Sequence, residues 1–478
     1  MRKELSIPSI IFFSYLMVLN TIAFGQTPRT ASKSEVRLVN NIPRLFLNGN
    51  ELNTVLVNVY YIYNPPPEAM PFQPKYGSEK WVNRMKSVID EASINGVKAI
   101  MLNVYWGDLD KSIRRPSNIG QNLDFSNLDI VMEYASRKNV YVILITVLYP
   151  AIPEWWAREN NFPPFNKKFP CDLCETDSYG NVYKNVSMNN DKVQRDFGSF
   201  IGAVINRYKN HPALLGWNMG VGATGEDNYG PNYIEMMGVT GGEKIERKPM
   251  MYSDYSPYFQ RKFKEWITIK YKTDTALQQA WGDKSVTLAR LVIPRPEELI
   301  INARGWHQIH RIALFPDPSD LWWKGDVKAL TKKGLDFYDF RNSMRRADRE
   351  YYAKLFRKND PNHILIFTGF NEELLNSSLC DGVAGNPNLC FDVPPDQMNR
   401  DYYLHLISLV KNAVKHKKLV IISAESTERS PSGRHDESLP PRPPSRLDIE
   451  RQIKYIETVG KAVKCANGMF AYVVSGYT

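Results

Sequence analysis

Short apolar runs recur along the chain and alternate with longer stretches in which apolar residues return at helical spacing. The apolar runs span residues 55–61, 99–106, 141–148, 214–220, 364–368, 388–393, 419–423 and 469–474. Near-continuous apolar runs of this length are typical of parallel strands covered on both faces. Eight such strands, alternating with amphipathic stretches of helix length, predict an α/β fold of the (β/α)8 TIM barrel type.

The intervening amphipathic stretches predict helices at residues 81–94, 128–137, 197–208, 336–357, 400–414 and 447–463. A long insertion follows the fourth strand and holds two further helices, at 257–271 and 276–281, and a tryptophan-rich stretch at 306–323. We expect the barrel to occupy residues 55–478. The sequence stops just past the eighth strand, so either the outer ring of helices is left open there or the sequence is truncated.

The residues before the barrel divide into two parts. Residues 1–25 combine a charged start, an apolar run and a small-residue site at Ala23-Phe24-Gly25, which is the pattern of a signal peptide. An uncleaved anchor helix is the alternative, although Pro8 interrupts the run. Residues 26–54 form a polar lead and a hairpin with an Asn48-Gly49 turn, which we expect to close the barrel floor. We therefore expect a secreted or periplasmic protein without a membrane span after cleavage.

The formal net charge is +10, and removal of residues 1–25, which carry Arg2, Lys3 and Glu4, lowers it to +9. Such a charge raises the question of nucleic acid or an acidic polymer as a partner. The positive residues are dispersed, however, and the cluster at 415–418 is typical of a solvated surface. We expect no nucleic-acid partner.

Five cysteines are few for a secreted protein of this size. Cys171 and Cys174 have the spacing of half a zinc site or a redox pair, but no second ligand pair lies nearby, which favours a loop disulfide or two free thiols. Cys380 and Cys390 flank a turn and could bridge, leaving Cys465 as a buried thiol. No cofactor or metal is expected.

Several segments resemble the catalytic barrel of family 42 β-galactosidases, within the clan A glycoside hydrolases. The similar segments, in chain order, are 123–129 with 149–155, 211–217, 266–282, and 336–341 with 360–363. The resemblance runs from about residue 55 to the C-terminus. It implies an acid/base carboxylate at the end of the fourth strand and a nucleophilic carboxylate at the end of the seventh.

The strand count independently places carboxylates at both positions. Glu425 follows the apolar run of the seventh strand and is the expected nucleophile, with Glu428 as its nearest competitor. The alternative is a surface glutamate paired with Arg429. Because the carboxyl ends of all barrel strands open onto one mouth, two carboxylates there can face each other across a sugar.

Glu226 is the first carboxylate after the fourth strand, in a glycine-rich segment, and is the expected acid/base. The Asn-Glu pair that the family carries directly after this strand is absent. Asp227 is the second choice, and Asn371-Glu372 becomes the candidate pair if the strand count is off by one. A third alternative is a barrel that has lost its acid.

Aromatic rings and amides at strand ends are candidates for sugar binding, because a flat ring packs against the C–H face of a pyranose. The expected substrate-binding residues are Asn103, Trp106, Trp217, Asn218 and Asp392. Trp155, Trp156, Trp322 and Trp323 could line outer subsites, or they could serve packing.

These observations predict a secreted, retaining glycoside hydrolase that cleaves oligo- or polysaccharides, with β-galactosides implied by the resemblance. The first alternative is a carbohydrate-binding barrel without catalysis. The second is a basic secreted protein that binds acidic polymers by charge, with an affinity that falls as salt rises.

Overall fold

The computed structural model describes residues 30–60, 77–147, 152–162, 165, 171–187, 189–220, 254–299, 330–369, 372–385, 400–425, 457 and 459–475. Within them a closed barrel of parallel strands runs in the order β4-β5-β6-β9-β10-β11-β12-β13 and back to β4. Its strands are β4 (Leu56–Tyr60), β5 (Ala99–Tyr105), β6 (Tyr141–Val147), β9 (Leu214–Gly220), β10 (Ile364–Thr368), β11 (Gly382–Gly385), β12 (Leu419–Glu425) and β13 (Met469–Ser475). The predicted (β/α)8 fold is confirmed.

Strand register separates inward-facing from outward-facing positions. Trp217 of β9 packs against Phe356 of a surrounding helix. The side chain of Trp217, and those two residues away from it along the strand, therefore face outward. Its neighbour Asn218 pairs with Ile145 of β6, which pairs in turn with Asn103 of β5. Because successive strand residues point to opposite faces, these three belong to the inward series.

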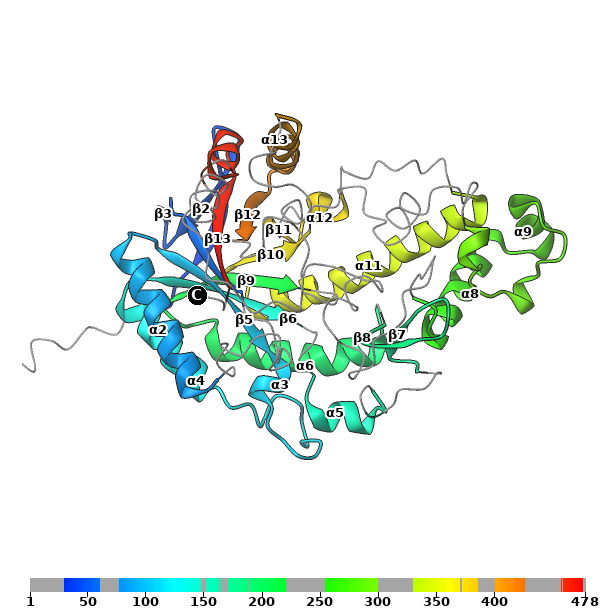
Figure 1. Cartoon of the computed structure of the whole chain (residues 1–478), viewed down its shortest axis with the longest axis horizontal. Helices are drawn as coiled ribbons and strands as arrows, with labels where there is room; N and C mark the ends of the chain where they lie inside the picture. Colours follow the sequence, from blue (N-terminus) through cyan, green and yellow to red (C-terminus); the bar gives the residue numbers. More distant parts are fainter. Residues whose placement is uncertain are drawn as a thin grey trace, which may run out of the picture.

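Helices cover the barrel on its outside (Figure 1). The long ones are α2 (Glu79–Ile94), α4 (Ser126–Arg137), α6 (Asp191–Tyr208), α11 (Lys332–Asn359) and α13 (Arg400–Lys415). Each of α2, α6 and α11 begins at a polar N-cap, in α6 at Asn190, whose side chain accepts from the next turn. The short helices are α3 (Trp106–Leu109), α5 (Glu154–Glu159) and α12 (Glu372–Asn376). Fully buried apolar side chains such as Ile89 each stabilise the fold by about 1.5–3 kcal/mol.

A side wall extends beyond the carboxyl ends of the strands. It consists of β7 (Cys174–Thr176), β8 (Val182–Val186), α8 (Pro257–Tyr271) and the first half of α11, and it lies on the side toward which β5, β6 and β9 run in Figure 1. The insertion after β9 also holds α9 (Asp274–Trp281) and the 3-10 turns η1 (Leu288–Arg290) and η2 (Pro296–Glu298). The two predicted insertion helices are thus confirmed.

A three-stranded sheet closes the opposite end of the barrel. It is formed by β1 (Ser34–Val39), β2 (Ile42–Leu47) and β3 (Asn50–Glu51). The Ser34 hydroxyl donates to the Leu215 carbonyl and accepts from the Ile364 amide at 3.0 Å, so it joins the amino ends of β9 and β10. The expected floor hairpin is confirmed, while β1 lies where only a polar lead was expected.

The predicted sixth strand at 388–393 is wrong. The sixth strand of the barrel is β11, and residues 388–393 lie outside the described residues. β11 does not form an apolar run in the sequence because it begins and ends with glycine. Gly382 is required there for a steric reason, since a Cβ at this position would lie 2.7 Å from the Leu419 carbonyl oxygen. The predicted helix at 447–463 is described only at 457 and 459–463, where it is helical.

The cysteines follow the sequence prediction in part. Cys171 and Cys174 form a disulfide, which confirms one of the two favoured states. The possible Cys380–Cys390 bridge is wrong, because Cys380 is a free thiol that contacts the Gly382 carbonyl at 2.6 Å, whereas Cys390 lies outside the described residues. Burial raises the pKa of Cys380 to about 11. Cys465 is also free but exposed, so the expected buried thiol is wrong as well.

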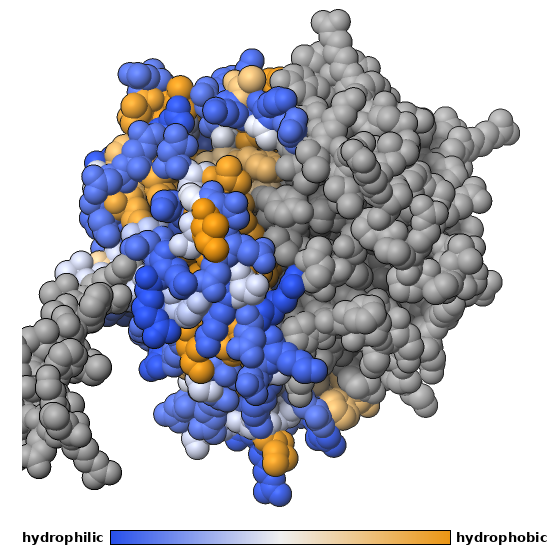
Figure 2. Space-filling view, turned by 60° about the vertical axis from the view of Figure 1, so that its left-hand side comes forward, coloured by the Kyte–Doolittle hydropathy of each residue, from blue (hydrophilic) through white to orange (hydrophobic). Residues whose placement is uncertain are grey.

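The surface around the floor is mostly hydrophilic, with apolar residues scattered over it (Figure 2). Exposed examples in the described residues include Val55 and Ile94, and isolated exposures of this kind are normal for globular proteins. In the part of the chain that the structure describes, no helix combines the length and apolar character needed to cross a bilayer.

Candidate active site at the barrel mouth

Polar residues occupy several of the inward-facing positions near the carboxyl ends of the barrel strands, among apolar ones such as Ile145 and Val473. We call this set the polar mouth, and its described members are Asn58, Asn103, Tyr105, Asn218, Thr368, Ser423 and Glu425. All follow the alternation that Asn103 and Asn218 define. Apart from Glu425 they are amides and hydroxyls, which suit the hydroxyl groups of a neutral ligand.

Two of the mouth amides are held by neighbouring hydroxyls. The Asn103 amide donates to the Tyr105 hydroxyl at 2.7 Å, and the Thr368 hydroxyl donates to the Asn218 Oδ1 at 3.1 Å. These bonds hold the two amide groups on the inner face of the barrel. Both residues are predicted from the sequence to bind substrate. That role stays a prediction, and the structure brings the two residues together through their shared partner strand.

Glu425 is the last residue of β12. It belongs to the same alternation as Ser423, whose side chain is buried, and it pairs with Val473 of β13, which pairs with Asn58 of β4. The strand predicted from the sequence ended at residue 423, two residues before the observed end of β12. The expected nucleophile thus lies on the strand itself, at the mouth, rather than in the loop beyond it.

The acid/base candidate and several others lie outside the described residues. These are Glu226, Asp227, Asn371, Asp392, Glu428, Arg429, Trp322 and Trp323. The barrel order nevertheless tests the strand count, because β9 is the fourth barrel strand and β10 the fifth. Asn371-Glu372 therefore follows the fifth strand, and the alternative that required a count off by one is wrong.

Trp217 does not line the mouth, which corrects its expected role. Its indole Nε1 donates to the Asp360 carboxylate at 2.8 Å in the outer layer, and the side chain is 1% exposed. Burial alone would raise the pKa of Asp360, but hydrogen bonds from His363 and Trp217 lower it. Adjacent strand residues face opposite sides, so Trp217 and Asn218 cannot both face a sugar.

Trp106 is likewise a packing residue. It begins α3, is 1% exposed, and has the rings of Trp155 and Phe200 each 6.0 Å from its own. Trp155 and Trp156 are also buried, and their indole N–H groups donate to Asp110 and Asp196. The packing alternative for these two is therefore the one that the structure supports.

The side wall contains buried charges that the sequence did not single out. Glu175 of β7 accepts from the Asn185 amide of β8 at 2.5 Å and interacts electrostatically with Arg341 of α11. Burial lowers the pKa of Arg341 to about 10, against the effect of Glu175, which raises it. The one available signal was the spacing of Arg341, Arg345 and Arg349, which repeats every four residues along one helix face.

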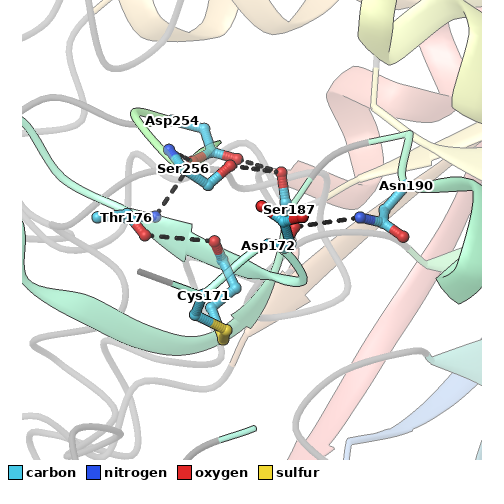
Figure 3. Close-up of a disulfide and its surroundings, with 8 residues drawn as sticks. Cys171, Asp172, Thr176, Ser187, Asn190, Asp254 and Ser256 are labelled. Carbon is cyan, nitrogen blue, oxygen red and sulfur yellow. Dashed lines mark hydrogen bonds between the residues drawn. A yellow bond between two sulfur atoms is a disulfide. The ribbon is translucent and has the colours of Figure 1, made fainter. Parts of the chain in front are cut away.

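A fully buried carboxylate, Asp254, joins α8 to the β7–β8 hairpin near the disulfide (Figure 3). It accepts from the Ser187 hydroxyl, from the Ser256 amide at 2.7 Å and from the Thr176 amide at 3.1 Å. Burial raises its pKa to about 6, although these three hydrogen bonds oppose the rise. These bonds all go to groups of the protein, so Asp254 connects two parts of the wall rather than offering a group to a ligand.

Comparison with known proteins agrees with this architecture. Residues 111–235 match the model of glycoside hydrolase family 42, described as Beta-galactosidase, which confirms the resemblance over that segment. No curated protein matches the chain in sequence. The chain is therefore similar to this family over these residues, within a closed barrel.

Solved structures similar to this chain include β-galactosidases and the catalytic domain of a β-amylase. A β-galactosidase from the Antarctic haloarchaeon Halorubrum lacusprofundi has a TM-score of 0.52 at 14% identity, over 88% of this chain and 52% of its own. A β-galactosidase from Bacillus circulans sp. alkalophilus has a TM-score of 0.47 at 15% identity, over 75% of this chain and 43% of its own. The catalytic domain of β-amylase from Paenibacillus polymyxa has a TM-score of 0.49 at 13% identity, over 84% of this chain and 91% of its own. The chain spans about half or less of the length of the β-galactosidases.

Proposed function

We propose that the protein is a retaining glycosidase that cleaves β-linked neutral sugars, with β-galactosides as the first substrates to test. The observation that carries the proposal is the position of Glu425 at the carboxyl end of β12, in the inward row that also holds the amides of Asn103 and Asn218. The match of residues 111–235 to the family 42 model supports the substrate class.

In the proposed mechanism Glu425 attacks the anomeric carbon while Glu226 gives a proton to the departing glycosidic oxygen. The bond from the anomeric carbon to that oxygen breaks, and a glycosyl ester on Glu425 forms. Glu226 then takes a proton from water, which attacks the ester and frees Glu425. Two inversions give net retention, and no cofactor takes part.

Export is also part of the proposal. Residues 1–25 have the pattern of a signal peptide, and the Cys171–Cys174 disulfide supports an oxidising compartment, where such bonds persist. An alkaline phosphatase fusion to residues 1–25 in a bacterial host should be active only if the segment directs export.

The test of catalysis is hydrolysis of aryl β-glycosides by the full chain and by Glu425→Gln and Glu226→Gln. We expect each substitution to lower kcat by about 10²–10⁴-fold or more, because each removes a group that acts on the reacting atoms. Glu457→Gln, at an exposed glutamate paired with Lys461, is the matched control and should keep full activity. If Glu425→Gln retains more than a tenth of the activity, the assignment of the nucleophile fails.

A second candidate is a carbohydrate-binding barrel without catalysis. It is favoured by β9, which reads Trp217-Asn218-Met219-Gly220 and carries no carboxylate. Sugar binding by calorimetry, with no release of aryl alcohol from any aryl β-glycoside tested, would support this candidate over the first.

A further inference from the structure

Asn58 is a polar residue in the middle of an apolar strand, at an inward position of β4. Val473 flanks it on one side and Met101 on the other, and Val473 in turn pairs with Glu425. Asn58 and Glu425 are thus two strands apart in one row, which corresponds to about 10 Å between their backbones. Both positions are within reach of a single sugar ring held at the mouth.

The side-chain oxygen of Asn58 differs from the amide groups of Asn103 and Asn218 in lacking a hydrogen-bond partner. This Oδ1 atom is buried, whereas the other two amide groups are bonded to Tyr105 and Thr368. A buried acceptor without a partner destabilises a protein, so native structures contain few of them and each needs an explanation. A ligand hydroxyl that donates a hydrogen bond to this oxygen would explain why it has no partner in the protein.

We propose that Asn58 is a specificity-determining residue whose side-chain oxygen accepts a hydrogen bond from a hydroxyl of the sugar bound beside Glu425. The assignment rests on the proposed carbohydrate function and deepens it: the site takes a neutral sugar with a free hydroxyl at that point. A sugar without this hydroxyl leaves the amide unpaired and binds more weakly.

The test uses the full chain carrying Glu425→Gln, so that ligands bind without turnover, with and without Asn58→Ala. Methyl β-galactoside, methyl β-glucoside and their monodeoxy forms are titrated by calorimetry, and Tm is measured without sugar. We expect Asn58→Ala to raise the Kd of the preferred glycoside about 10-fold, which is the effect of one neutral hydrogen bond. It should also leave Tm unchanged or raise it, because it removes an unpaired buried group.

One deoxy sugar should identify the partner hydroxyl. It should bind about 10-fold more weakly than its parent to the protein with Asn58, and as well as its parent to the Asn58→Ala variant. Val57→Ala, at the outward neighbour on the same strand, is the matched control, and it should lower Tm without changing any Kd.

The remaining outcomes separate this inference from the function on which it rests. If the glycosides bind and Asn58→Ala leaves every Kd unchanged or lowers Tm by several degrees, the assignment of Asn58 is overturned and the carbohydrate function stands. If none of the glycosides binds to the protein with Asn58, the carbohydrate function is overturned, and the assignment with it. Binding without hydrolysis in the wild type, weakened by Asn58→Ala, supports the assignment on a non-catalytic barrel.

Discussion

The barrel mouth and the side wall both bury polar groups, but of different kinds. Those at the mouth are mainly amides and hydroxyls from strands, such as Asn103 and Thr368. Those in the wall are charged, such as Glu175 and Arg341, and come from a helix and a hairpin. A neutral group can lose and regain a partner at modest cost, whereas a buried charge without compensation is far more destabilising. The mouth therefore suits exchange of ligands, and the wall suits permanent support.

A hydrogen bond to a buried carboxylate also joins α11 to a helix that covers the barrel. Gln194 of α6 donates to Asp348 of α11 at 2.8 Å, which connects a barrel helix to the helix that carries the buried arginines. This bond holds α6 against the helix whose first half forms part of the wall. Substitutions in the wall should affect stability first, and substitutions in the mouth should affect ligand binding first.

The largest effect should come from Arg341→Met. The substitution removes a guanidinium that is 2% exposed and that interacts electrostatically with Glu175, which is 1% exposed. Breaking a buried pair from one side lowers the free energy of unfolding by about 3–5 kcal/mol. Urea denaturation measures it, with Lys354→Met, at an exposed lysine paired with Glu350, as the control expected to change less than about 0.5 kcal/mol.

A double variant tests whether the loss reflects the pair. Arg341→Met combined with Glu175→Gln should recover at least half of the loss, since the second change removes the stranded charge. If the losses in the free energy of unfolding caused by the two single substitutions simply add, the two charges act independently. The view that the wall is held together by paired buried charges is then contradicted.

The next effect should be a change in pH dependence caused by Asp254→Asn. The pKa of Asp254 is raised to about 6 in the folded state, above its ordinary value of 3.8, so between these values the folded protein holds a proton that the unfolded chain has released. The stability from this group is fully present below about pH 4 and is lost as pH rises through 6. The loss is about 3 kcal/mol.

Asparagine at 254 keeps an acceptor for the two backbone amides and has no proton to lose. The free energy of unfolding of Asp254→Asn, minus that of the wild type, should therefore rise by up to about 3 kcal/mol between pH 4 and pH 7. Urea titrations at four pH values measure it. Glu350→Gln, on the exposed face of α11, should show a flat difference, and a flat difference for Asp254→Asn too would contradict the raised pKa.

The sequence predicted the strands that consist of apolar runs and missed the one that does not. The predicted bounds of β9 and β10 agree with the structure, because runs such as 364–368 are buried on both faces. β11 was missed because its close approach to β12 requires glycine rather than a β-branched residue. Propensity describes single strands, whereas this constraint comes from the neighbouring strand.

The candidate site was predictable where it depends on strand ends and not where it depends on facing direction. Glu425 was placed by the end of an apolar run, and the structure puts it on β12. Trp217 was chosen by residue type, although its parity with Asn218 assigns it to the outer layer. Asn58 was missed, since one amide in an apolar strand is ambiguous until register shows which side it faces. The spacing of the arginines on α11 marks one helix face, but only tertiary packing shows that this face is buried.

The smallest effects are expected from Trp217→Phe and Asn218→Ala. Comparing the two substitutions tests whether these adjacent residues face opposite sides of β9. Trp217→Phe removes the hydrogen bond to Asp360 in the outer layer, and we expect a loss of about 2 kcal/mol in the free energy of unfolding. Sugar affinity should stay within about twofold, because the indole lies outside the barrel. Asn218→Ala should do the opposite, weakening sugar binding about 10-fold or more with a smaller change in stability, because the amide lies in the inward row beside Thr368. If Trp217→Phe instead weakens binding as strongly as Asn218→Ala, the division of β9 into an outer packing face and an inner ligand face is wrong, and the tryptophan returns to the site.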